Sequence, residues 1–546
     1  MNVKRFIALG SFAFLLAVTL VAAQDDQDGK ERDKPTVPDE FVMSILPSRI
    51  EYNPIHTFTS SEAQLYTAIY EGLVTYNPLT MDPVPAAAQR WEVTPDGKTY
   101  RFYLRENARY WNGDTVTAAD FRNAWLKLLD PAEKSEYSFL FDIIAGAEDY
   151  RTGKNPDPDS VGIKVLSEKV LEVQLAKPAT HFLQILCHHS FVPIHPEMQN
   201  VSDWNSLPSI LGNGPYYIIS KSDSEIVLRK NELYWDRKNV SINKIRVIMS
   251  DDYAGTTAQF NVGKIDWVAS GMSLQDVKDP ANLVINPLFA TTYYFISSRE
   301  EPWTNPDVRR ALALLLPWDE IRSPDIQFIP ADTLVPQIPY YPEVKGITEK
   351  NSEEALKLLA KAGFPGGKGL PEITVKVPDG DESARVAGIM KNAWEALDGV
   401  TVNVKSVDYG NYFESLKDAD YLVGTVSWIA DFADPLTFLQ MWTSGSNLND
   451  SGYSNPRYDA LIASSFEQTG VPRYETLAKA EEMLLSTGVV LPVSHSPAIN
   501  LIDMRRFDGW YPNPLDIHPF KFLKFAVHKP LPNLASRSGT LPVAAR

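Results

Sequence analysis

Cysteine is nearly absent from this chain of 546 residues, which contains only Cys187. A single cysteine permits no disulfide within the chain and no cluster of metal-binding thiolates. Positive charge is also in deficit, because 52 Lys and Arg stand against 69 Asp and Glu and leave a formal net charge of -17. Such a field repels phosphate backbones and anionic lipid head groups, so nucleic acid is not an expected partner.

The motifs of common enzyme classes are missing as well. The eight histidines show no His-Glu-x-x-His spacing, and the chain has no Gly-x-Ser-x-Gly elbow. We interpret His188 and His189 as residues of one strand, whose side chains point to opposite faces and therefore do not share a metal ion. We expect no metal, no cofactor and no enzymatic activity, although the many carboxylates keep a secreted hydrolase as an alternative.

Long apolar runs are confined to the N-terminal region. Lys4 and Arg5 precede an apolar run over residues 7–20, and Val21-Ala22-Ala23 supplies small residues for cleavage. This pattern predicts a signal peptide over residues 1–23, with an apolar run too short and too weakly flanked to anchor the protein in a membrane. No cysteine follows the predicted cleavage site, so we expect neither lipid attachment nor direct membrane insertion.

Aromatic residues and proline are plentiful, with 24 Tyr, 12 Trp and 40 Pro. The chain is longer than one hydrophobic core normally supports, so we expect two or three domains. Surplus amphipathic aromatic residues suit a binding cleft.

Hydrophobic patterning changes near residue 300. Before it, the chain is rich in strands, Asp96-Gly97 predicts a hairpin, and Thr117 with Asp120 predicts a capping box at a helix start. After it, strands alternate with helices, which predicts parallel pairing and an α/β fold. The expected strands are 91–93, 99–104, 161–166, 170–175, 216–219, 225–229, 244–249, 373–377, 400–404 and 421–426, and the expected helices are 61–73 with a stop at Gly72, 117–129, 305–316, 351–363, 383–397, 411–418 and 436–442.

The stretch 427–435 lies between an expected buried strand and an expected helix. Asp434 precedes Pro435, which predicts that Asp434 caps this helix with proline at its first position. Asp431 lies between Trp428 and Phe432, where a carboxylate loses several kcal/mol of hydration unless a cation meets it. That cation is either a Lys or Arg of the protein or the ammonium group of a ligand.

Eight stretches, taken together and in order, resemble the solute-binding proteins of bacterial peptide ABC transporters, and most closely their oligopeptide-binding branch. The resemblance extends over roughly residues 40–525. The stretches are 70–73, 91–100, 117–121 with Asp130-Pro131, 213–216, 229–236, 305–312, 358–363 and 427–438.

The resemblance implies a two-lobed periplasmic-binding-protein fold of the α/β class, with mixed sheets, hinged lobes and an additional inserted domain. It places lobe I at 24–70, 196–292 and 511–546, the extra domain II at 71–195, and lobe III at 293–510. It further implies a monomer in the periplasm that closes over short peptides and delivers them to a membrane ABC permease.

The resemblance also implies the ligand-binding residues. Asp431 would receive the α-ammonium group of the peptide, and the neighbouring backbone would pair with the ligand as an added strand. The residues implied to contact the ligand are Asp431, Trp428, Ser427, Val426, Asn447 or Asn449, Tyr137 and Tyr511.

Two stretches depart from the oligopeptide-binding branch and leave the ligand open. Ser270-Gly271-Met272 stands where that branch has asparagines, and residues 57–61 carry hydroxyls where a Glu is expected. Relatives with this fold also bind oligosaccharides, metal complexes or haem, so a non-peptide ligand is an alternative. A surface adhesion or scaffold protein is a further one.

Overall fold

The computed structural model of the chain describes residues 39–179, 181–323, 329–338, 340–432 and 434–526. The predicted signal peptide and the C-terminal segment from Lys529 lie outside these residues. Within the described ranges, no helix combines the length and apolar character needed to cross a membrane. Helices accompany sheets with both parallel and antiparallel pairing, so the α/β prediction with mixed sheets is confirmed.

Seven of the described strands form the first sheet, in which parallel pairing occurs only on either side of β1. The remaining neighbours are antiparallel. In sheet order, the strands are β12 (Leu283–Pro287), β19 (Pro497–Ile502), β11 (Trp267–Val268), β1 (Glu40–Ile45), β10 (Lys244–Met249), β9 (Glu225–Lys230) and β8 (Tyr216–Lys221).

Six described strands form the second sheet, whose central strand β13 (Ala290–Ile296) is buried on both faces. Tyr293 and Phe295 join one hydrophobic core and Tyr294 and Ile296 another, because successive side chains of a strand point to opposite faces. The other strands are β14 (Ile329–Pro330), β18 (Val490–His495), β17 (Val423–Ile429), β15 (Ile373–Pro378) and β16 (Val402–Val407), in the order β14-β18-β13-β17-β15-β16.

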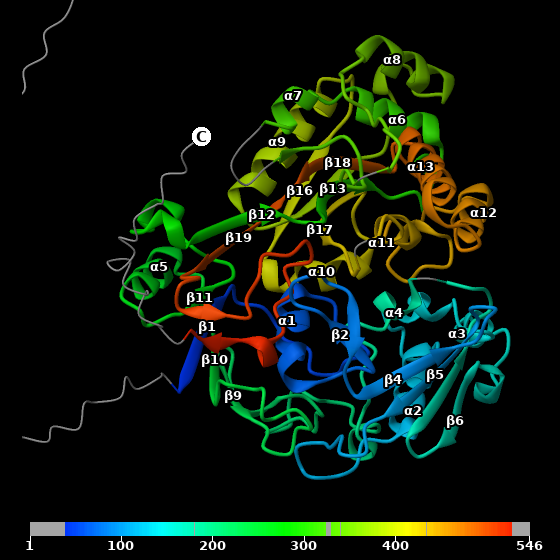
Figure 1. Cartoon of the computed structure of the whole chain (residues 1–546). Helices are drawn as coiled ribbons and strands as arrows, with labels where there is room; N and C mark the ends of the chain where they lie inside the picture. The colour runs from blue at the N-terminus through cyan, green and yellow to red at the C-terminus, as the bar shows by residue number, and fades with distance from the viewer. Residues whose placement is uncertain (1–38, 180, 324–328, 339, 433, 527–546) are drawn as a thin grey trace, which may run out of the picture. The chain divides into compact units, whose positions relative to one another are not determined.

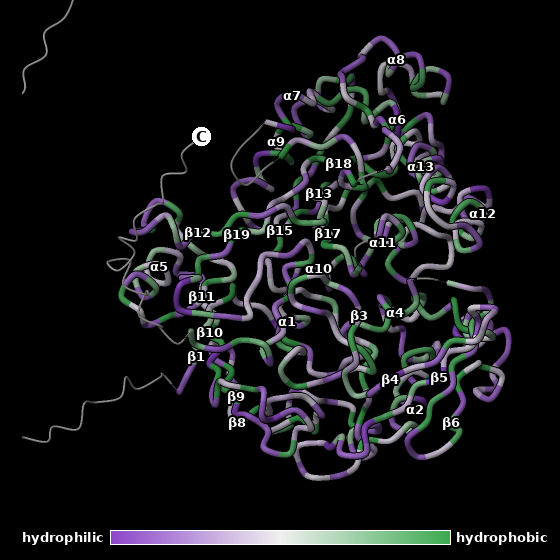
Figure 2. Tube along the Cα trace, in the orientation of Figure 1, coloured by the Kyte–Doolittle hydropathy of each residue, from purple (hydrophilic) through white to green (hydrophobic). Residues whose placement is uncertain are grey.

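Strand β15 pairs in parallel with both β16 and β17, as the alternation of strands and helices predicts. The core on the Tyr294 face lies wholly within residues 294–493 and includes apolar residues of α6 (Pro306–Leu314), α8 (Ser352–Lys361) and α9 (Asp381–Glu395). Figure 2 shows hydrophobic and hydrophilic residues alternating along these helices, as expected for helices with one buried side.

A third, antiparallel sheet lies wholly within the segment expected to form the extra domain. Its order is β4 (Ala88–Val93), β5 (Thr99–Leu104), β7 (Val170–Gln174) and β6 (Ile163–Ser167). Helix α2 (Ala118–Leu129) begins with the predicted capping box between Thr117 and Asp120. Two short pairs complete the pairing of the described strands, namely β2 (Val74–Tyr76) with β3 (Pro83–Pro85) and β20 (Phe507–Asp508) with β21 (Lys524–Phe525).

Most expected helices are present with shifted ends. Helix α1 (Ser60–Ile69) ends before the predicted stop at Gly72, because Tyr70 is extended and its buried hydroxyl donates to Tyr52 O. The remaining described α-helices are α3 (Ala147–Arg151), α4 (Phe182–Ile185), α5 (Tyr253–Asn261), α7 (Trp318–Ile321), α10 (Tyr409–Ser415), α11 (Leu436–Leu439), α12 (Pro456–Ser465) and α13 (Gly470–Ser486).

Two segments that pass between the first and second sheets run side by side (Figure 1). The chain passes from β12 to β13 and returns from β18 to β19, and each pair of strands is antiparallel within its own sheet. The expected lobe III includes residues 497–502, whereas the pairing places β19 in the first sheet. The return to the first sheet therefore lies at Ser496.

Candidate functional site

Strand β17 brings the predicted site residues to the edge of the second sheet. It pairs with β13 along its whole length but with β15 only at Val423. The Tyr412 hydroxyl donates to Thr425 O and accepts from Thr425 N–H on the side away from β13. Backbone groups of alternate strand residues point to the same edge, so Ser427 presents its N–H and C=O on this side, beyond the last paired residue of β15.

Asp431 follows the end of β17 and is held in place through its backbone. Its N–H donates to Thr437 Oγ1 at 3.0 Å, and its carbonyl accepts from the Tyr76 hydroxyl at 2.8 Å. The Thr437 hydroxyl in turn donates to Asp431 Oδ2 at 3.1 Å. Thr437 and Tyr76 were not identified from the sequence, because nothing in their spacing indicates these contacts.

The Asp431 carboxylate is buried, with 6% of its side chain exposed. In the part of the chain that the structure describes, no Lys or Arg nitrogen lies within 4.0 Å of it. Burial raises the pKa of Asp431 to about 7, since desolvation penalises the charged form and only hydrogen bonds oppose it. Of the two cations considered from the sequence, a protein Lys or Arg is therefore not found among the described residues.

His188 is the titratable group beside Asp431, with Nε2 at 3.5 Å from Oδ1. The Ser190 N–H donates to His188 Nδ1 at 3.3 Å, so the neutral ring carries its proton on Nε2, which faces the carboxylate. Burial lowers the pKa of His188 to about 3. The ring is therefore uncharged at neutral pH, and its Nε2 makes no hydrogen bond to the described residues, so it is no counter-ion for Asp431.

The interpretation of His188 and His189 as residues of one strand is wrong. They follow α4 in a turn, and their rings pack 4.0 Å apart between centroids. Tyr137 lies 4.2 Å from the His188 ring and 6.4 Å from the Trp428 ring. Phe58 extends this aromatic group, at 6.3 Å from Trp428.

These residues line a cavity of about 280 Å³, which we call the first cavity. Of the predicted site residues, it brings together Val426, Ser427, Trp428, Asp431 and Tyr137. Phe58, His188 and His189 also line it and were not predicted to do so. Its opposite wall includes residues of α1 and the segment 515–521.

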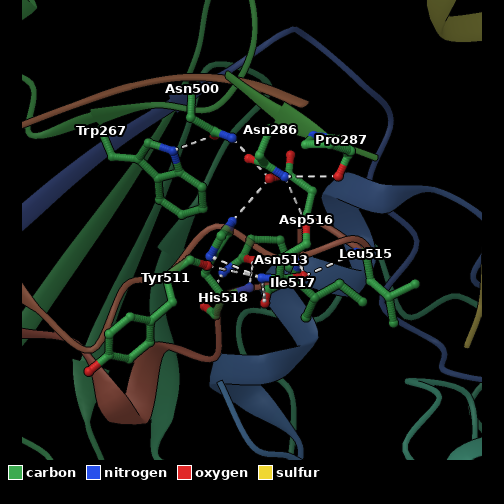
Figure 3. Close-up of polar contacts among 11 residues, drawn as sticks. Trp267, Asn286, Pro287, Asn500, Tyr511, Asn513, Leu515, Asp516, Ile517 and His518 are labelled. Atoms are coloured by element: carbon green, nitrogen blue, oxygen red, sulfur yellow. Dashed lines mark hydrogen bonds and ion pairs between the residues drawn. The ribbon is translucent and has the colours of Figure 1, made fainter. Parts of the chain in front are cut away.

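A polar network holds the segment 515–521 against the first sheet (Figure 3). Asp516 Oδ1 accepts from Asn500 Nδ2 at 2.9 Å and lies 3.1 Å from His518 Nε2. The Trp267 indole N–H donates to Asn500 Oδ1, and Asn286 of β12 donates to Asn513 O. One wall of the cavity is therefore tied to β12 and β19, the two strands next to the crossings.

The other predicted site residues lie outside the lining of the first cavity. Asn447 Nδ2 donates to Ser135 O at 2.6 Å and to Ser138 Oγ at 2.9 Å. Asn449 organises its own loop, donating to the carbonyls of Trp442, Thr443 and Tyr453. The Tyr511 side chain points away from the network in Figure 3, and the residue is 37% exposed.

Asp434 provides a second buried carboxylate in the same loop. It pairs with Arg473 through two contacts of 2.6 and 2.8 Å and accepts from Leu436 N–H at 2.9 Å. The prediction that Asp434 is the N-cap and Pro435 the first helical residue is wrong by one position, because α11 begins at Leu436 with Pro435 as its N-cap, although Asp434 Oδ1 accepts the Leu436 N–H.

Comparison with known proteins gives a consistent result. The family model of the bacterial extracellular solute-binding proteins, family 5 Middle, matches residues 82–450. The oligopeptide-binding protein OppA of Bacillus subtilis is 30% identical over 451 residues, which are 78% of this chain and 81% of that protein. The solved structure of the Escherichia coli murein tripeptide binding protein MppA is 25% identical, covers 90% of this chain and 100% of its own, and has a TM-score of 0.81. The solved structure of MppA in an unliganded open form is also 25% identical and covers 90% of this chain and 98% of its own. Its TM-score is 0.60.

Proposed function

Because the chain belongs to the bacterial extracellular solute-binding proteins of family 5, we propose that it captures short peptides between two lobes and delivers them to an ABC permease. The observation that carries the proposal is Asp431, a buried carboxylate in the wall of the first cavity without a Lys or Arg partner among the described residues. Every peptide with a free N-terminus carries an ammonium group that fits this position. A charge-assisted hydrogen bond in such a buried site is stronger than one in water.

The edge of β17 supplies the second part of the recognition. The backbone of Ser427 faces the cavity side of the strand, where an extended peptide adds as a neighbour. Trp428 and Val426, with Tyr137 from the other side, enclose the first side chain of the ligand. Recognition of the ammonium group and of the backbone is common to all peptides, which favours broad specificity.

The lobes that we propose follow the sheets. Among the described residues, lobe I comprises residues 39–70, 196–289 and 497–526, and lobe III comprises 290–496, with 71–195 as the extra domain II. Asn447 and the ion pair of Lys417 with Glu136 join lobe III to the extra domain. Together with the lower TM-score to an unliganded open form, these contacts favour a closed arrangement.

We propose that the protein acts as a monomer in the periplasm, exported by the predicted signal peptide and released from it. Its action on the peptide is binding alone, without covalent chemistry. Asn447, Asn449 and Tyr511 contribute through closure and loop structure in this proposal, because none of them lines the first cavity.

Calorimetric titration tests the proposal. The mature protein is unfolded and refolded to remove bound ligand, then titrated with peptides of two to six residues and with the same peptides acetylated at the N-terminus. We expect binding of the free peptides and a loss of at least about 100-fold on acetylation, since the ammonium contact is removed. Absence of binding by free peptides would reject peptide capture, whereas equal binding of acetylated peptides would reject Asp431 as the anchor.

A further inference from the structure

Two side chains in the wall of the first cavity hold a buried N–H group without a hydrogen-bond partner. They are Trp428 and His188, 5% and 4% exposed, and among the described residues neither Trp428 Nε1 nor His188 Nε2 finds an acceptor. The indole nitrogen always carries a proton, and the neutral His188 ring carries its proton on Nε2 because Nδ1 accepts the Ser190 N–H. Both groups are therefore donors.

The two donor side chains lie close to the carboxylate that is proposed to anchor the ligand. His188 Nε2 is 3.5 Å from Asp431 Oδ1. The Tyr137 ring lies close to both donor side chains, at 4.2 Å from the His188 ring and 6.4 Å from the Trp428 ring. All four residues line the first cavity, whose wall therefore combines one anionic acceptor with two neutral donors.

A ligand anchored at Asp431 brings its first side chain against these donors, because Trp428 and Tyr137 enclose that side chain in the proposed function. A buried donor left without an acceptor costs more free energy than a formed hydrogen bond contributes. An apolar first side chain would exclude water from both N–H groups and replace none of the hydrogen bonds that water makes. A neutral oxygen would accept from them, whereas a carboxylate would add a second negative charge beside Asp431.

We propose that His188 and Trp428 select peptides whose first residue carries a neutral hydrogen-bond acceptor in its side chain, such as asparagine, over peptides that begin with an apolar residue of the same shape. This inference rests on the proposed function and adds a preference at one position of its ligand. A site built around hydrogen-bond donors discriminates against a ligand that lacks the acceptor, because the donors are then left unpaired. Recognition of the ammonium group and of the backbone stays common to all peptides.

Three tripeptides that differ only in their first side chain test the inference by calorimetric titration. The probes are Asn-Ala-Ala, Leu-Ala-Ala and Asp-Ala-Ala, each with a free N-terminus. Asparagine and leucine have nearly the same shape, so this pair isolates the acceptor. Aspartate keeps the acceptor and adds the charge.

Two histidine variants form a matched pair for this titration. In His188→Asn, the amide oxygen can still accept the Ser190 N–H in place of Nδ1, but the Nε2 donor is lost. The control is His195→Asn, because His195 is equally buried, its Nδ1 also accepts an N–H two residues later, from Glu197, and its Nε2 also meets a carboxylate, that of Asp114. His195 does not line the first cavity.

We expect Asn-Ala-Ala to bind the wild type and the control at least about tenfold more tightly than either other peptide. In His188→Asn the ratio of the Asn-Ala-Ala and Leu-Ala-Ala affinities should fall to within about threefold, whereas mere structural damage would weaken both peptides and leave their ratio unchanged. If Leu-Ala-Ala binds the wild type as tightly as Asn-Ala-Ala, or if the ratio persists in His188→Asn, the inference is overturned and the proposed function stands. If no peptide binds, the proposed function fails and this inference with it.

Nuclear magnetic resonance of the indole groups gives a readout that does not depend on affinity. The wild type is labelled with nitrogen-15 tryptophan, and the Trp428 indole signal is assigned as the one missing from the Trp428→Phe spectrum. We expect the Trp428 indole proton to shift to lower field on saturation with Asn-Ala-Ala and not with Leu-Ala-Ala, since only the former supplies an acceptor. Equal positions of this signal in the two complexes would overturn the inference.

Discussion

Asp431 and Asp434 stand three positions apart in one loop, are equally buried at 9% exposure, and have opposite surroundings. Asp434 meets the Arg473 guanidinium through two contacts and also accepts the first N–H of α11. Among the described residues, the Asp431 carboxylate accepts a hydrogen bond from the Thr437 hydroxyl and meets no Lys or Arg, and the uncharged His188 ring lies 3.5 Å away. Burial of an unpaired charge costs several kcal/mol, so only Asp434 contributes to the fold as a charge. The difference separates a structural carboxylate from one that faces a ligand.

The largest effect is expected for Asp434, the structural carboxylate of the two, and it concerns the stability of the protein. In Asp434→Asn, the buried Arg473 loses its charge partner, and we expect the free energy of unfolding to fall by about 3–5 kcal/mol. Urea denaturation of the ligand-free protein measures this. The affinity of the folded protein for peptide should stay within about threefold of wild type. A stability loss below about 1 kcal/mol would show that the pair has no structural role.

Replacing Asp431 should have the converse result. We expect Asp431→Asn to lower peptide affinity by about 100-fold, because the ammonium group loses its charged partner. The ligand-free protein should become more stable at pH 8, not less. The pKa of Asp431 is raised by burial from 3.8 to about 7, so the folded state holds more protons than the unfolded state between these values, and stability falls as the pH rises toward 7. The substitution removes that penalty.

Glu481 provides a matched control for the variants Asp434→Asn and Asp431→Asn. Burial raises its pKa to about 7 as well, but it accepts hydrogen bonds from Leu334 N–H, Val335 N–H and the Tyr341 hydroxyl. Glu481 does not line the first cavity. Glu481→Gln should therefore leave peptide affinity unchanged, and a large loss of affinity in this variant would mean that burial of a carboxyl, not its position, decides the effect.

Much of the local structure around these two carboxylates can be predicted from the sequence. Which of them pairs with an arginine cannot. The strand before Asp431 and the capping box of α2 follow from local patterns, and both are present. Which of the two carboxylates finds an arginine is decided by Arg473, which lies far along the chain and shows no local signal. The Nε2–H form of His188 depends on a backbone donor in a turn that was interpreted as a strand.

The same limit applies to Asn447. Its position after the helix suggested a ligand contact, but its amide bonds to Ser135 and Ser138, more than 300 residues earlier in the chain. Long-range pairing of this kind leaves no trace in spacing or periodicity, whereas helix and strand patterns arise from neighbours and are visible in the sequence.

An effect of intermediate size is expected for the pH dependence of peptide binding, which tests the charge of Asp431. Asp431 must lose its proton before it pairs with an ammonium group, so peptide affinity should fall by about tenfold per pH unit below pH 7 and level off above it. Tyr76, Tyr137 and His188 lie around this carboxyl, and His189 packs on His188. None of them titrates between pH 5 and 7, because burial raises the pKa of the tyrosines and lowers that of the histidines. Calorimetry in two buffers of different ionisation enthalpy measures the proton released. A pH-independent affinity would mean that another group anchors the peptide.

The smallest effect is expected at Arg49, which lines the first cavity and carries an exposed charge. Arg49 lies 3.4 Å from Glu414, and both side chains are largely exposed, so the pair contributes about 0–1 kcal/mol to closure. We expect Arg49→Gln to weaken binding of a free tripeptide by about two- to fivefold, because its carboxylate ends near this guanidinium, and to leave the C-terminally amidated tripeptide unchanged. Lys417→Gln removes an ion pair between lobe III and the extra domain, with Glu136, outside the first cavity. If both variants weaken the free and the amidated peptide equally, Arg49 acts through closure alone. A loss restricted to the free acid would make Arg49 the cationic counterpart of Asp431, a charge that faces the ligand at the other end.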